Sequence, residues 1–337
     1  MGKETERIKA LVELGHYLQE YQTQKKGYEA LDKTLPLASA TNGWFTEESM
    51  QTALNSWGTT LSQENVTHWI ANYNLRTPKN PKTIGLVLAG NIPLVGFHDL
   101  ICVWMSGHKA QIKKSSKDSV LLPFIANQLE TIGGSNCFEF RDTPLSQVDA
   151  VIATGSNNAA RYFEHYFSKI PNIIRKNRNG LAVLTGKESK EELELLGKDI
   201  LQYYGLGCRN VSKMLLPQGF DVNLIFGGLY PWASVLDNIK YAHNYDYNKA
   251  VFLMSEFDFL ENGFFLLKQD SAIAAPIATG YYDYYENEQA VQTYLETHKN
   301  EIQCVLGKQH LPFGTSQKPQ LWEYADQVDT LAFLQSL

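Results

Sequence analysis

Residues 83–93 read TIGLVLAGNIP, and they decide the fold class of this chain. The first seven form a short apolar run of the kind that makes a buried strand. Gly90-Asn91-Ile92-Pro93 then breaks this run before a helical segment that continues to about Ser106. A buried strand followed by a turn and a helix is the unit from which parallel sheets are built. The stretch therefore predicts the first βα unit of an α/β domain.

Two more units of the same kind follow. Residues 110–113 form a second short strand, which leads through a polar loop into a helix at about 119–131. Residues 148–153 form a third strand, and a turn over residues 154–156 connects it to a helix over 157–167. Strands that alternate with helices imply parallel pairing with right-handed crossovers, so we expect a doubly wound sheet.

The loops after these strands are polar and fall where doubly wound sheets bind their ligands, outside the carboxyl ends of the strands. Asn91 could donate its side-chain amide to an oxyanion, although asparagine in a turn more commonly serves the turn itself. The other two loops could hold a phosphate, or could be ordinary solvated loops. Their candidate cofactor-binding residues are Lys113, Ser116, Lys117, Thr154, Gly155 and Ser156. Neither a G-x-G-x-x-G fingerprint nor a Walker loop is present, so an ordinary Rossmann or P-loop site is not supported.

The rest of the chain predicts a helical region before these units and a second βα section after them. Helical spacing covers residues 5–22, and Thr46 and Ser62 are expected N-caps of two further helices. A strand over 181–184 precedes a helix over 190–204, which Gly205 should end, and Glu261-Asn262-Gly263 predicts a hairpin turn. We expect an α/β protein with a first domain over 1–179 that includes the N-terminal helices, a second domain over 180–310, and a tail over 311–337 that packs back on them.

Composition excludes several classes of protein. The 337 residues carry 30 basic and 36 acidic side chains, a net charge of −6, so a nucleic-acid partner is not expected. The four cysteines are too few and too dispersed for a disulfide framework, and no metal-ligand spacing occurs. The polar N-terminus and the lack of a long apolar run predict no signal peptide and no membrane insertion. A cytoplasmic location is the resulting expectation.

Cys208 is the candidate nucleophile. It lies in Gly205-Leu206-Gly207-Cys208-Arg209, where two glycines let the backbone and a flat ligand approach closely. The neighbouring Arg209 would favour the thiolate, which is the reactive form. The alternative is a small buried hydrophobic residue in a turn at a helix end, as we expect for the other three cysteines.

In this order the motifs resemble those of the aldehyde dehydrogenase superfamily, over about residues 80–215 and more loosely beyond. The resemblance implies an aldehyde dehydrogenase-like fold of two doubly wound α/β domains, a dinucleotide-binding domain over 1–179 and a catalytic domain over 180–310. The family's tryptophan-asparagine-aromatic-proline motif is matched by Gly90-Asn91-Ile92-Pro93, and its lysine stretch by residues 112–116. Its threonine-glycine-serine turn is Thr154-Gly155-Ser156, and its cysteine segment is matched, with the order of residues changed, by residues 205–208. Residues 42–46 and 313–319 are similar to the acyl-CoA reductase branch, the type found in bacterial bioluminescence fatty-acid reductase.

Two departures from the family pattern define the expected chemistry. Arg175 stands about where the family has the glutamate that activates water, and Ala272 stands near the place of the glutamate that holds the nicotinamide ribose. The resemblance thus implies a reductase that protects its acyl-enzyme from water. Cys208 would attack an acyl-CoA or acyl-carrier-protein thioester, and Asn91 would stabilise the oxyanion. Ser116 stands where a glutamate commonly selects NADH, so NADPH is the expected cofactor, with NADH as the alternative.

Three other functions stay open at this point. The substrate could be an acyl phosphate, as in glutamyl-phosphate reductases. Cys208 could serve a thioesterase or acyltransferase that needs no hydride. The chain could also be a scaffold that has kept the fold without the reaction. A homodimer is a further expectation, although the chain is markedly shorter than a typical aldehyde dehydrogenase, which leaves the family's oligomerisation hairpin in doubt.

Overall fold

The computed structural model describes residues 3–24, 26–75 and 77–337 and divides the chain into two compact units. Unit 1 runs to Lys176 and takes up the chain again from Gln320 to Leu337, whereas unit 2 is Asn177–Pro319. The boundary expected between residues 179 and 180 falls inside strand β6 (Asn179–Val183), and the observed division lies just before this strand. The C-terminal tail is itself divided, because its residues up to Pro319 belong to unit 2.

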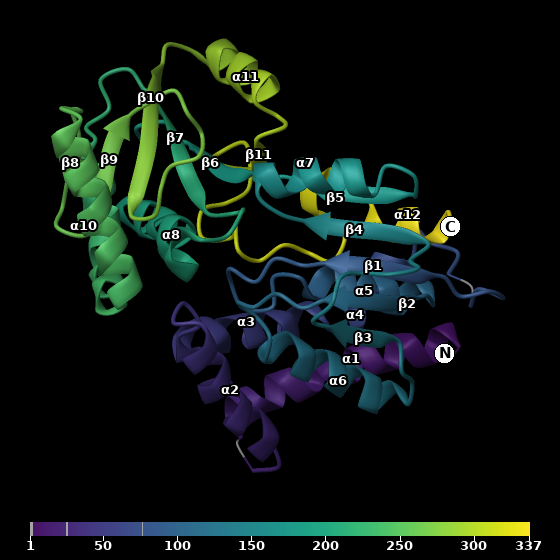
Figure 1. Cartoon of the computed structure of the whole chain (residues 1–337). Coiled ribbons are helices and arrows are strands. Elements are labelled where there is room, and N and C mark those ends of the chain that lie inside the picture. The colour runs from purple at the N-terminus through teal and green to yellow at the C-terminus, as the bar shows by residue number, and fades with distance from the viewer. Residues whose placement is uncertain (1–2, 25, 76) are drawn as a thin grey trace. The chain divides into compact units, whose positions relative to one another are not determined.

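Unit 1 is built on a parallel sheet with the strand order β3-β2-β1-β4-β5 (Figure 1). Leu86 of β1 lies beside Ile112 of β2 on one side and Ile152 of β4 on the other, and all three are buried. This apolar continuity is typical of a strand covered on both faces. The strands are β1 (Thr83–Val87), β2 (Lys109–Lys113), β3 (Phe138–Arg141), β4 (Ala150–Thr154) and β5 (Asn172–Arg175).

The crossover helices of unit 1 lie on both faces of this sheet. Helices α5 (Phe97–Ser106) and α6 (Leu121–Gly133) lead outward from β1 to β2 and β3, whereas α7 (Asn157–Tyr166) leads from β4 to β5 in the opposite direction. Figure 1 shows α7 on the other side of the sheet from α5 and α6. The strand order therefore reverses between β1 and β4, and a doubly wound sheet binds its ligand at such a point. The predicted doubly wound sheet is confirmed in this unit.

Helices at the N-terminus form the outer part of unit 1. The side-chain oxygens of Thr46 and Ser62 each accept a hydrogen bond of 3.2 Å from the backbone N–H three residues later, which confirms both as N-caps. One helix, α2, was not expected, because Pro36 lies inside it and interrupts the helical pattern. The helices are α1 (Glu4–Thr23), α2 (Glu29–Thr41), α3 (Glu47–Thr60) and α4 (Gln63–Ile70).

The last residues of the chain complete unit 1. Helix α12 (Thr330–Gln335) packs against α5, and the short 3-10 helix η3 (Ala325–Gln327) precedes it. The indole N–H of Trp69 donates to the hydroxyl of Tyr324 at 2.7 Å, and both side chains are buried. Two histidine rings, His98 and His108, bond to backbone carbonyls of this segment at 2.9 Å. Residues 320–337 are therefore part of the core of unit 1.

Unit 2 contains a second sheet, with the strand order β11-β6-β7-β10-β9-β8. Its strands run parallel except β8, which pairs antiparallel with β9 across Asn262 and Gly263, so the predicted hairpin is confirmed. Gly263 has φ 93°, a conformation that glycine adopts without strain. The strands after β6 are β7 (Val211–Pro217), β8 (Leu260–Glu261), β9 (Leu266–Gln269), β10 (Thr279–Tyr285) and β11 (Ile302–Leu306).

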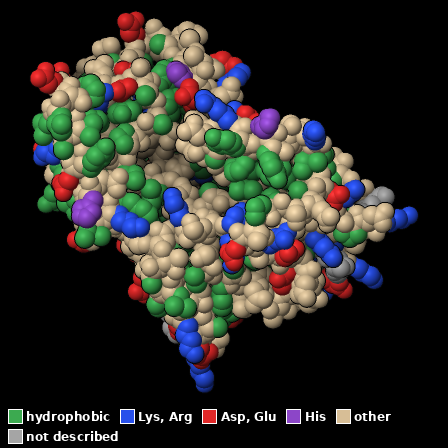
Figure 2. All heavy atoms as spheres, viewed as in Figure 1, with side chains coloured by type: hydrophobic (Ala, Val, Ile, Leu, Met, Phe, Trp, Pro, Cys, Tyr) green, Lys and Arg blue, Asp and Glu red, His purple; other side chains and the backbone are tan. Residues whose placement is uncertain are grey.

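The helices of unit 2 pack on this sheet, and one of them keeps an apolar surface. Leu181 and Leu215 of the sheet form a buried cluster with Val291 of α11. Helix α10 exposes Tyr247 and Met254, and Figure 2 shows hydrophobic side chains on the surface over α10 and β8. No helix within the described ranges is long and apolar enough to cross a membrane. The helices are α8 (Lys190–Leu201), η1 (Gln202–Gly205), α9 (Asn223–Leu229), η2 (Tyr230–Asp237), α10 (Ile239–Met254) and α11 (Glu288–Thr297).

Candidate functional site

The loops after β1, β2 and β4 lie at the carboxyl edge of the unit 1 sheet, as the sequence predicts. We call residues 90–94, 113–118 and 154–156 the unit 1 edge. The loops after β1 and β2 touch closely, because a Cβ atom added at Gly90 would lie only 2.4 Å from the hydroxyl oxygen of Ser115. Glycine is therefore required at this position by the approach of the second loop. Asn91 follows directly, in the turn between β1 and α5, and is half-buried.

A buried carboxyl group, Asp118, organises these two loops. One of its oxygens accepts a hydrogen bond from the backbone N–H of Leu94 at 3.3 Å, and the other accepts from Leu122 at 3.0 Å. Leu94 has φ 58°, a conformation that costs energy in a residue with a side chain. Burial raises the pKa of Asp118 to about 6, and the backbone bonds act in the opposite direction. Asp118 thus fixes the turn after Asn91 to the start of α6.

The lysine loop is held from a distant part of the sequence. The buried side chain of Asn42, at the end of α2, donates to the carbonyl oxygen of Lys117 at 3.1 Å. Asp142, in the loop after β3, binds the side chains of two lysines. Lys113 donates to its carbonyl oxygen at 2.7 Å, and the ammonium of Lys114 lies 3.0 Å from its carboxylate. Ser116 and Lys117 are exposed in a turn at the tip of the loop.

The turn after β4 forms the start of a helix, as predicted. The Ser156 hydroxyl oxygen accepts from the backbone N–H of Ala159 at 3.2 Å and so caps α7. A Cβ atom on Gly155 would lie 2.8 Å from the Cβ of Ala159, so glycine lets the helix pack against the end of its own strand. The unpaired backbone N–H groups of a helix N-terminus favour an anion, which is the property the sequence analysis assigned to this turn.

Cys208 lies in unit 2, at the amino edge of its sheet, in the turn before β7. The structure exposes Cys208 and buries Cys102, Cys137 and Cys304. Asn210 builds this turn. Its amide nitrogen donates to the carbonyl oxygens of Asp199, Ile200 and Gln202 at 3.1, 3.2 and 2.7 Å, and its amide oxygen accepts from the N–H of Gly207 at 2.8 Å. One side chain therefore connects the end of α8 to the cysteine turn.

These bonds explain why α8 ends at Leu201 and does not continue to Tyr204 as expected. The Asn210 amide takes carbonyl groups that a longer helix would use for its own backbone bonds. The chain then passes through three successive residues with positive φ, namely Tyr203 at 54°, Tyr204 at 59° and Gly205 at 74°. Gly205 is the last of these residues, so it ends a left-handed turn that follows the helix.

The neighbours of Cys208 are fixed by backbone contacts. The Arg209 guanidinium donates through Nε to the carbonyl oxygen of Ser316 at 2.5 Å, so part of this side chain serves the structure of unit 2. The thiol of Cys304 lies 3.7 Å from the carbonyl oxygen of Arg209. A Cβ atom on Gly180 would lie 2.6 Å from that same oxygen, so glycine is needed at this position of β6. The cysteine turn thus rests on β6 and β11.

Arg175 is a structural residue of unit 1. It ends β5, is 5% exposed, and donates to a carboxylate oxygen of Asp99 at 2.6 Å and to the hydroxyl of Thr330 at 2.9 Å. A guanidinium group stays protonated and has no acceptor, so it cannot take a proton from water. Its carboxylate partner is equally buried and is paired. The described residues also contain no group of three or more His, Cys, Asp or Glu that could hold a metal ion.

Comparisons with known proteins find similarity in structure but not in sequence. No family model and no curated protein matches this sequence. An aldehyde dehydrogenase of Mycobacterium tuberculosis in complex with NAD+ matches 87% of this chain and 71% of its own, with a TM-score of 0.61 and 13% identity. Aldehyde dehydrogenase 21 of Physcomitrella patens, in complex with the product succinate, matches 91% of this chain and 74% of its own, with a TM-score of 0.64 and 13% identity.

The chain has the aldehyde dehydrogenase fold. A further example is KauB of Pseudomonas aeruginosa, which matches with a TM-score of 0.62 and 13% identity over 91% of this chain and 72% of its own. The expected fold class is therefore confirmed, with the N-terminal helices included. Within the aldehyde dehydrogenase fold, the predicted cofactor residues belong to unit 1 and Cys208 belongs to unit 2. Their roles stay predictions.

Proposed function

We propose that this chain reduces an acyl thioester, such as acyl-CoA, to an aldehyde through a covalent intermediate on Cys208. The observation that carries the proposal is the cysteine turn. Among the four cysteines, Cys208 is the exposed one, and a buried asparagine holds its turn at the edge of a sheet. An exposed thiol on a fixed turn can approach a substrate carbonyl, whereas buried cysteines behave as small hydrophobic residues.

In the proposed reaction, the Cys208 thiolate attacks the thioester carbonyl carbon and forms a new carbon–sulfur bond. The bond to the sulfur of CoA breaks, and CoA leaves as a thiolate that takes up a proton. The backbone N–H of Cys208 would donate to the oxyanion that forms during this step, and the family resemblance adds the Asn91 amide as a second donor. A bound reduced nicotinamide would supply a hydride to the acyl carbon, and the carbon–sulfur bond to Cys208 would then break, which releases the aldehyde and restores the thiolate.

Arg175 supports reduction in preference to hydrolysis. The aldehyde dehydrogenase pattern places a carboxylate base at this position, and here it is a buried arginine bound to Asp99 and Thr330. Without that base, water attacks the acyl-enzyme slowly, so the intermediate persists until the hydride arrives. The same feature would suit an acyl-phosphate reductase, which releases phosphate in place of CoA.

The unit 1 edge supports a nicotinamide dinucleotide as cofactor. The order β3-β2-β1-β4-β5 is that of a dinucleotide-binding sheet, with its reversal between β1 and β4. Lys113 and Thr154 are the last residues of β2 and β4, and Ser116, Lys117, Gly155 and Ser156 follow in the loops at these carboxyl ends. Ser116 carries no charge to repel a 2′-phosphate, and Lys117 is exposed beside it, so NADPH is the proposed cofactor. Asp142 engages Lys113 and Lys114, which limits the preference to a moderate one.

Mass spectrometry of the acyl-enzyme tests the proposal. The protein is incubated with acyl-CoA without a reduced cofactor, digested and searched for an acyl group on the peptide that contains Cys208. We expect a stable adduct there, which NADPH then releases as aldehyde. Cys304→Ser is the matched control, because Cys304 lies beside the same turn but is buried.

The alternatives give different outcomes in the same experiment. Adduct formation from an acyl phosphate with release of inorganic phosphate, and none from acyl-CoA, would assign the acyl-phosphate reaction. Turnover to a free acid or an acyl transfer product without any nicotinamide would assign a thioesterase or acyltransferase. No adduct with either donor would contradict covalent catalysis and favour a scaffold without this reaction.

A further inference from the structure

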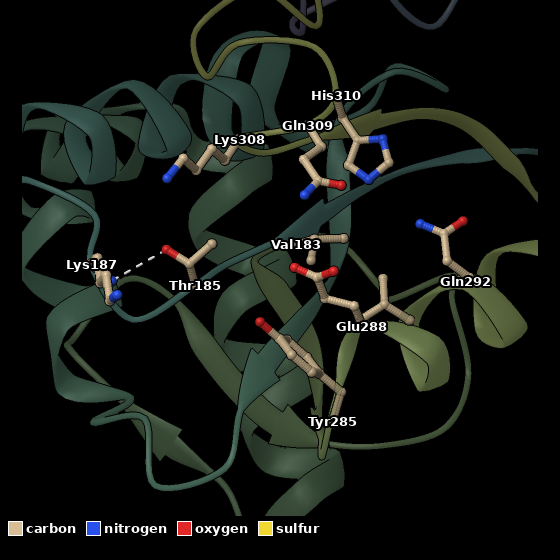
Figure 3. A pocket seen from close by; sticks show the side chains of 10 residues that line it. Val183, Thr185, Lys187, Tyr285, Glu288, Gln292, Lys308, Gln309 and His310 are labelled. Atoms are coloured by element: carbon tan, nitrogen blue, oxygen red, sulfur yellow. Dashed lines mark hydrogen bonds between the residues drawn. The ribbon is translucent and has the colours of Figure 1, made fainter.

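The carboxyl edge of the unit 2 sheet carries a polar pocket that the proposed reaction does not use. Strands β11, β6, β7 and β10 lie side by side in this order and all run parallel. Their carboxyl ends therefore lie at one edge of the sheet, where β6 ends at Val183, β10 at Tyr285 and β11 at Leu306. Two adjoining cavities of 360 and 450 Å³ open there and share the lining residues Thr185, Lys187, Lys308 and His310. Figure 3 shows Lys308, Gln309 and His310 along one side of the first cavity, with Glu288, Gln292 and Tyr285 across from them.

The cations of this pocket have no acidic partner. Within the described ranges, no carboxylate lies within ion-pair distance of the ammonium groups of Lys187 or Lys308. Three carboxylates line the two cavities, and two of them, Glu188 and Glu192, accept hydrogen bonds from backbone N–H groups. Glu188 accepts from the backbone N–H groups of Thr185 and Gly186 at 2.6 and 2.9 Å, and Glu192 accepts from Ser189 at 2.8 Å. The third basic group, His310, is half-buried, and burial lowers its pKa.

Loops at this edge are positioned as in ligand-binding doubly wound sheets. Residues 184–189 lead from β6 into α8, and residues 286–287 lead from β10 into α11. The capped start of α11, with Asn287 as its N-cap, lies at the same edge. Ligands of parallel sheets bind outside the carboxyl ends of the strands, between such loops. The position of these loops, the cavities between them and the two lysines without an acidic partner therefore all indicate a ligand-binding site.

The pocket is separate from the cysteine turn. Cys208 precedes the first residue of β7, and the pocket lies beyond the last residues of the strands parallel to it. Strand β7 has seven residues, so at about 3.3 Å per residue the two edges are roughly 20 Å apart. A ligand in this pocket does not reach the sulfur of Cys208, and the inference does not depend on the proposed reaction.

We propose that this pocket binds a phosphate group through Lys187 and Lys308. A phosphate dianion matches two ammonium donors, and Thr185, Gln309 and the His310 ring add uncharged hydrogen-bonding groups around it. Glu288 faces the same space and carries the one lining carboxylate of the first cavity. Its charge opposes an anion, so it weakens the binding of free phosphate.

Calorimetric titration of the full chain with inorganic phosphate, at constant ionic strength, tests the proposal. We expect saturable binding that weakens about tenfold or more in the double variant Lys187→Gln/Lys308→Gln. The matched control is Lys190→Gln, an exposed lysine at the start of α8 that pairs with Glu194 at 3.7 Å and does not line the pocket. This control should bind phosphate as the wild type does.

A second substitution, at Glu288, tests by the direction of its effect on phosphate affinity whether the lysines form a site. Glu288→Gln removes a like charge and should strengthen phosphate binding by about threefold. A parallel titration with adenosine monophosphate identifies the source of the group, since tighter binding than inorganic phosphate assigns a nucleotide and equal binding assigns the free ion. Absence of saturable binding would overturn the proposal, as would equal losses in the double variant and in Lys190→Gln.

Discussion

The two sheets of this protein share a parallel architecture, but their polar residues differ in how they are held. In unit 1 the loops at the carboxyl edge are bonded to one another and to distant helices, through Asp118 and Asn42. In unit 2 the candidate nucleophile lies at the amino edge, in a turn that the single side chain of Asn210 holds. The carboxyl edge of unit 2 carries exposed lysines, and its loop after β6 is held by local bonds from the backbone N–H groups of Thr185 and Gly186 to Glu188. The first two edges are therefore held by side chains from distant parts of the sequence, whereas this third edge is held by neighbours in the sequence.

The largest effect is expected from the cysteine turn itself. Cys208→Ala should abolish aldehyde formation, with a loss of about 10³-fold or more, because no other exposed cysteine replaces the nucleophile. The fold and nicotinamide binding in unit 1 should be unchanged. Steady-state reduction of acyl-CoA and a separate cofactor titration measure both. Wild-type turnover in the variant would refute a covalent role for this residue.

Asn210→Ala should show how much the turn depends on one side chain. The substitution leaves three carbonyl groups and the N–H of Gly207 without their partner, which should lower the free energy of unfolding by about 2–4 kcal/mol. Urea unfolding measures this loss. Asn223→Ala is the control, since Asn223 is exposed and its side chain bonds only to Asp221, and it should cost under about 1 kcal/mol. Equal losses would contradict the assigned role of Asn210.

Asp118→Asn tests the corresponding residue in unit 1 through pH. The pKa of Asp118 is raised to about 6 in the folded protein, so the folded state binds this proton more tightly than the unfolded chain does. Its contribution to stability is therefore present below about pH 4 and is lost as the pH rises through 6. An asparagine does not titrate. The variant should gain about 2–3 kcal/mol relative to the wild type between pH 4 and pH 7, measured by urea unfolding at each pH. If the free energies of unfolding of the wild type and the variant changed with pH in the same way, the raised pKa of Asp118 would be contradicted.

The smallest effect concerns cofactor choice at the unit 1 edge. The wild type should have a higher kcat/KM with NADPH than with NADH, because neither Ser116 nor Lys117 would repel a 2′-phosphate. We expect a ratio of only about tenfold, since Asp142 already engages Lys113 and Lys114. Ser116→Glu should shift the ratio toward NADH. Added salt should reduce the wild-type preference. Equal kcat/KM values of the wild type with NADPH and NADH would contradict the proposed preference for NADPH.

The fold could be predicted from the sequence because its units repeat a strong local pattern. The apolar runs that became β1, β2 and β4 each precede a turn and a helix, and their pairing follows from right-handed crossovers. Strands β3 and β5 were not predicted, since both are short and only partly buried, and four residues carry little periodic signal. Strands β7, β10 and β11 of unit 2 were not predicted either. The end of α8 was misplaced for a different reason, because a side chain later in the sequence determines it.

The candidate site was predictable only in part. Cys208, Asn91 and the three polar loops carry residue types that chemistry requires, so they could be named in advance. Asn42, Asp118 and Asn210 could not, because their function lies in bonds between a side chain and a backbone group. The bond from Asn42 to Lys117 spans 75 residues. One usable signal was present, since Asp118 follows a basic loop and precedes the apolar start of a helix, where a buried carboxylate can cap it.

The return of the chain to unit 1 at Gln320 sets an order of events during synthesis. The ribosome releases residues 177–319 before residues 320–337, so unit 2 has all of its chain when unit 1 still lacks α12 and Tyr324. Until then Arg175 has Asp99 but not Thr330, and Trp69 has no phenol to receive its indole proton. The first domain to leave the ribosome is thus the last to be completed.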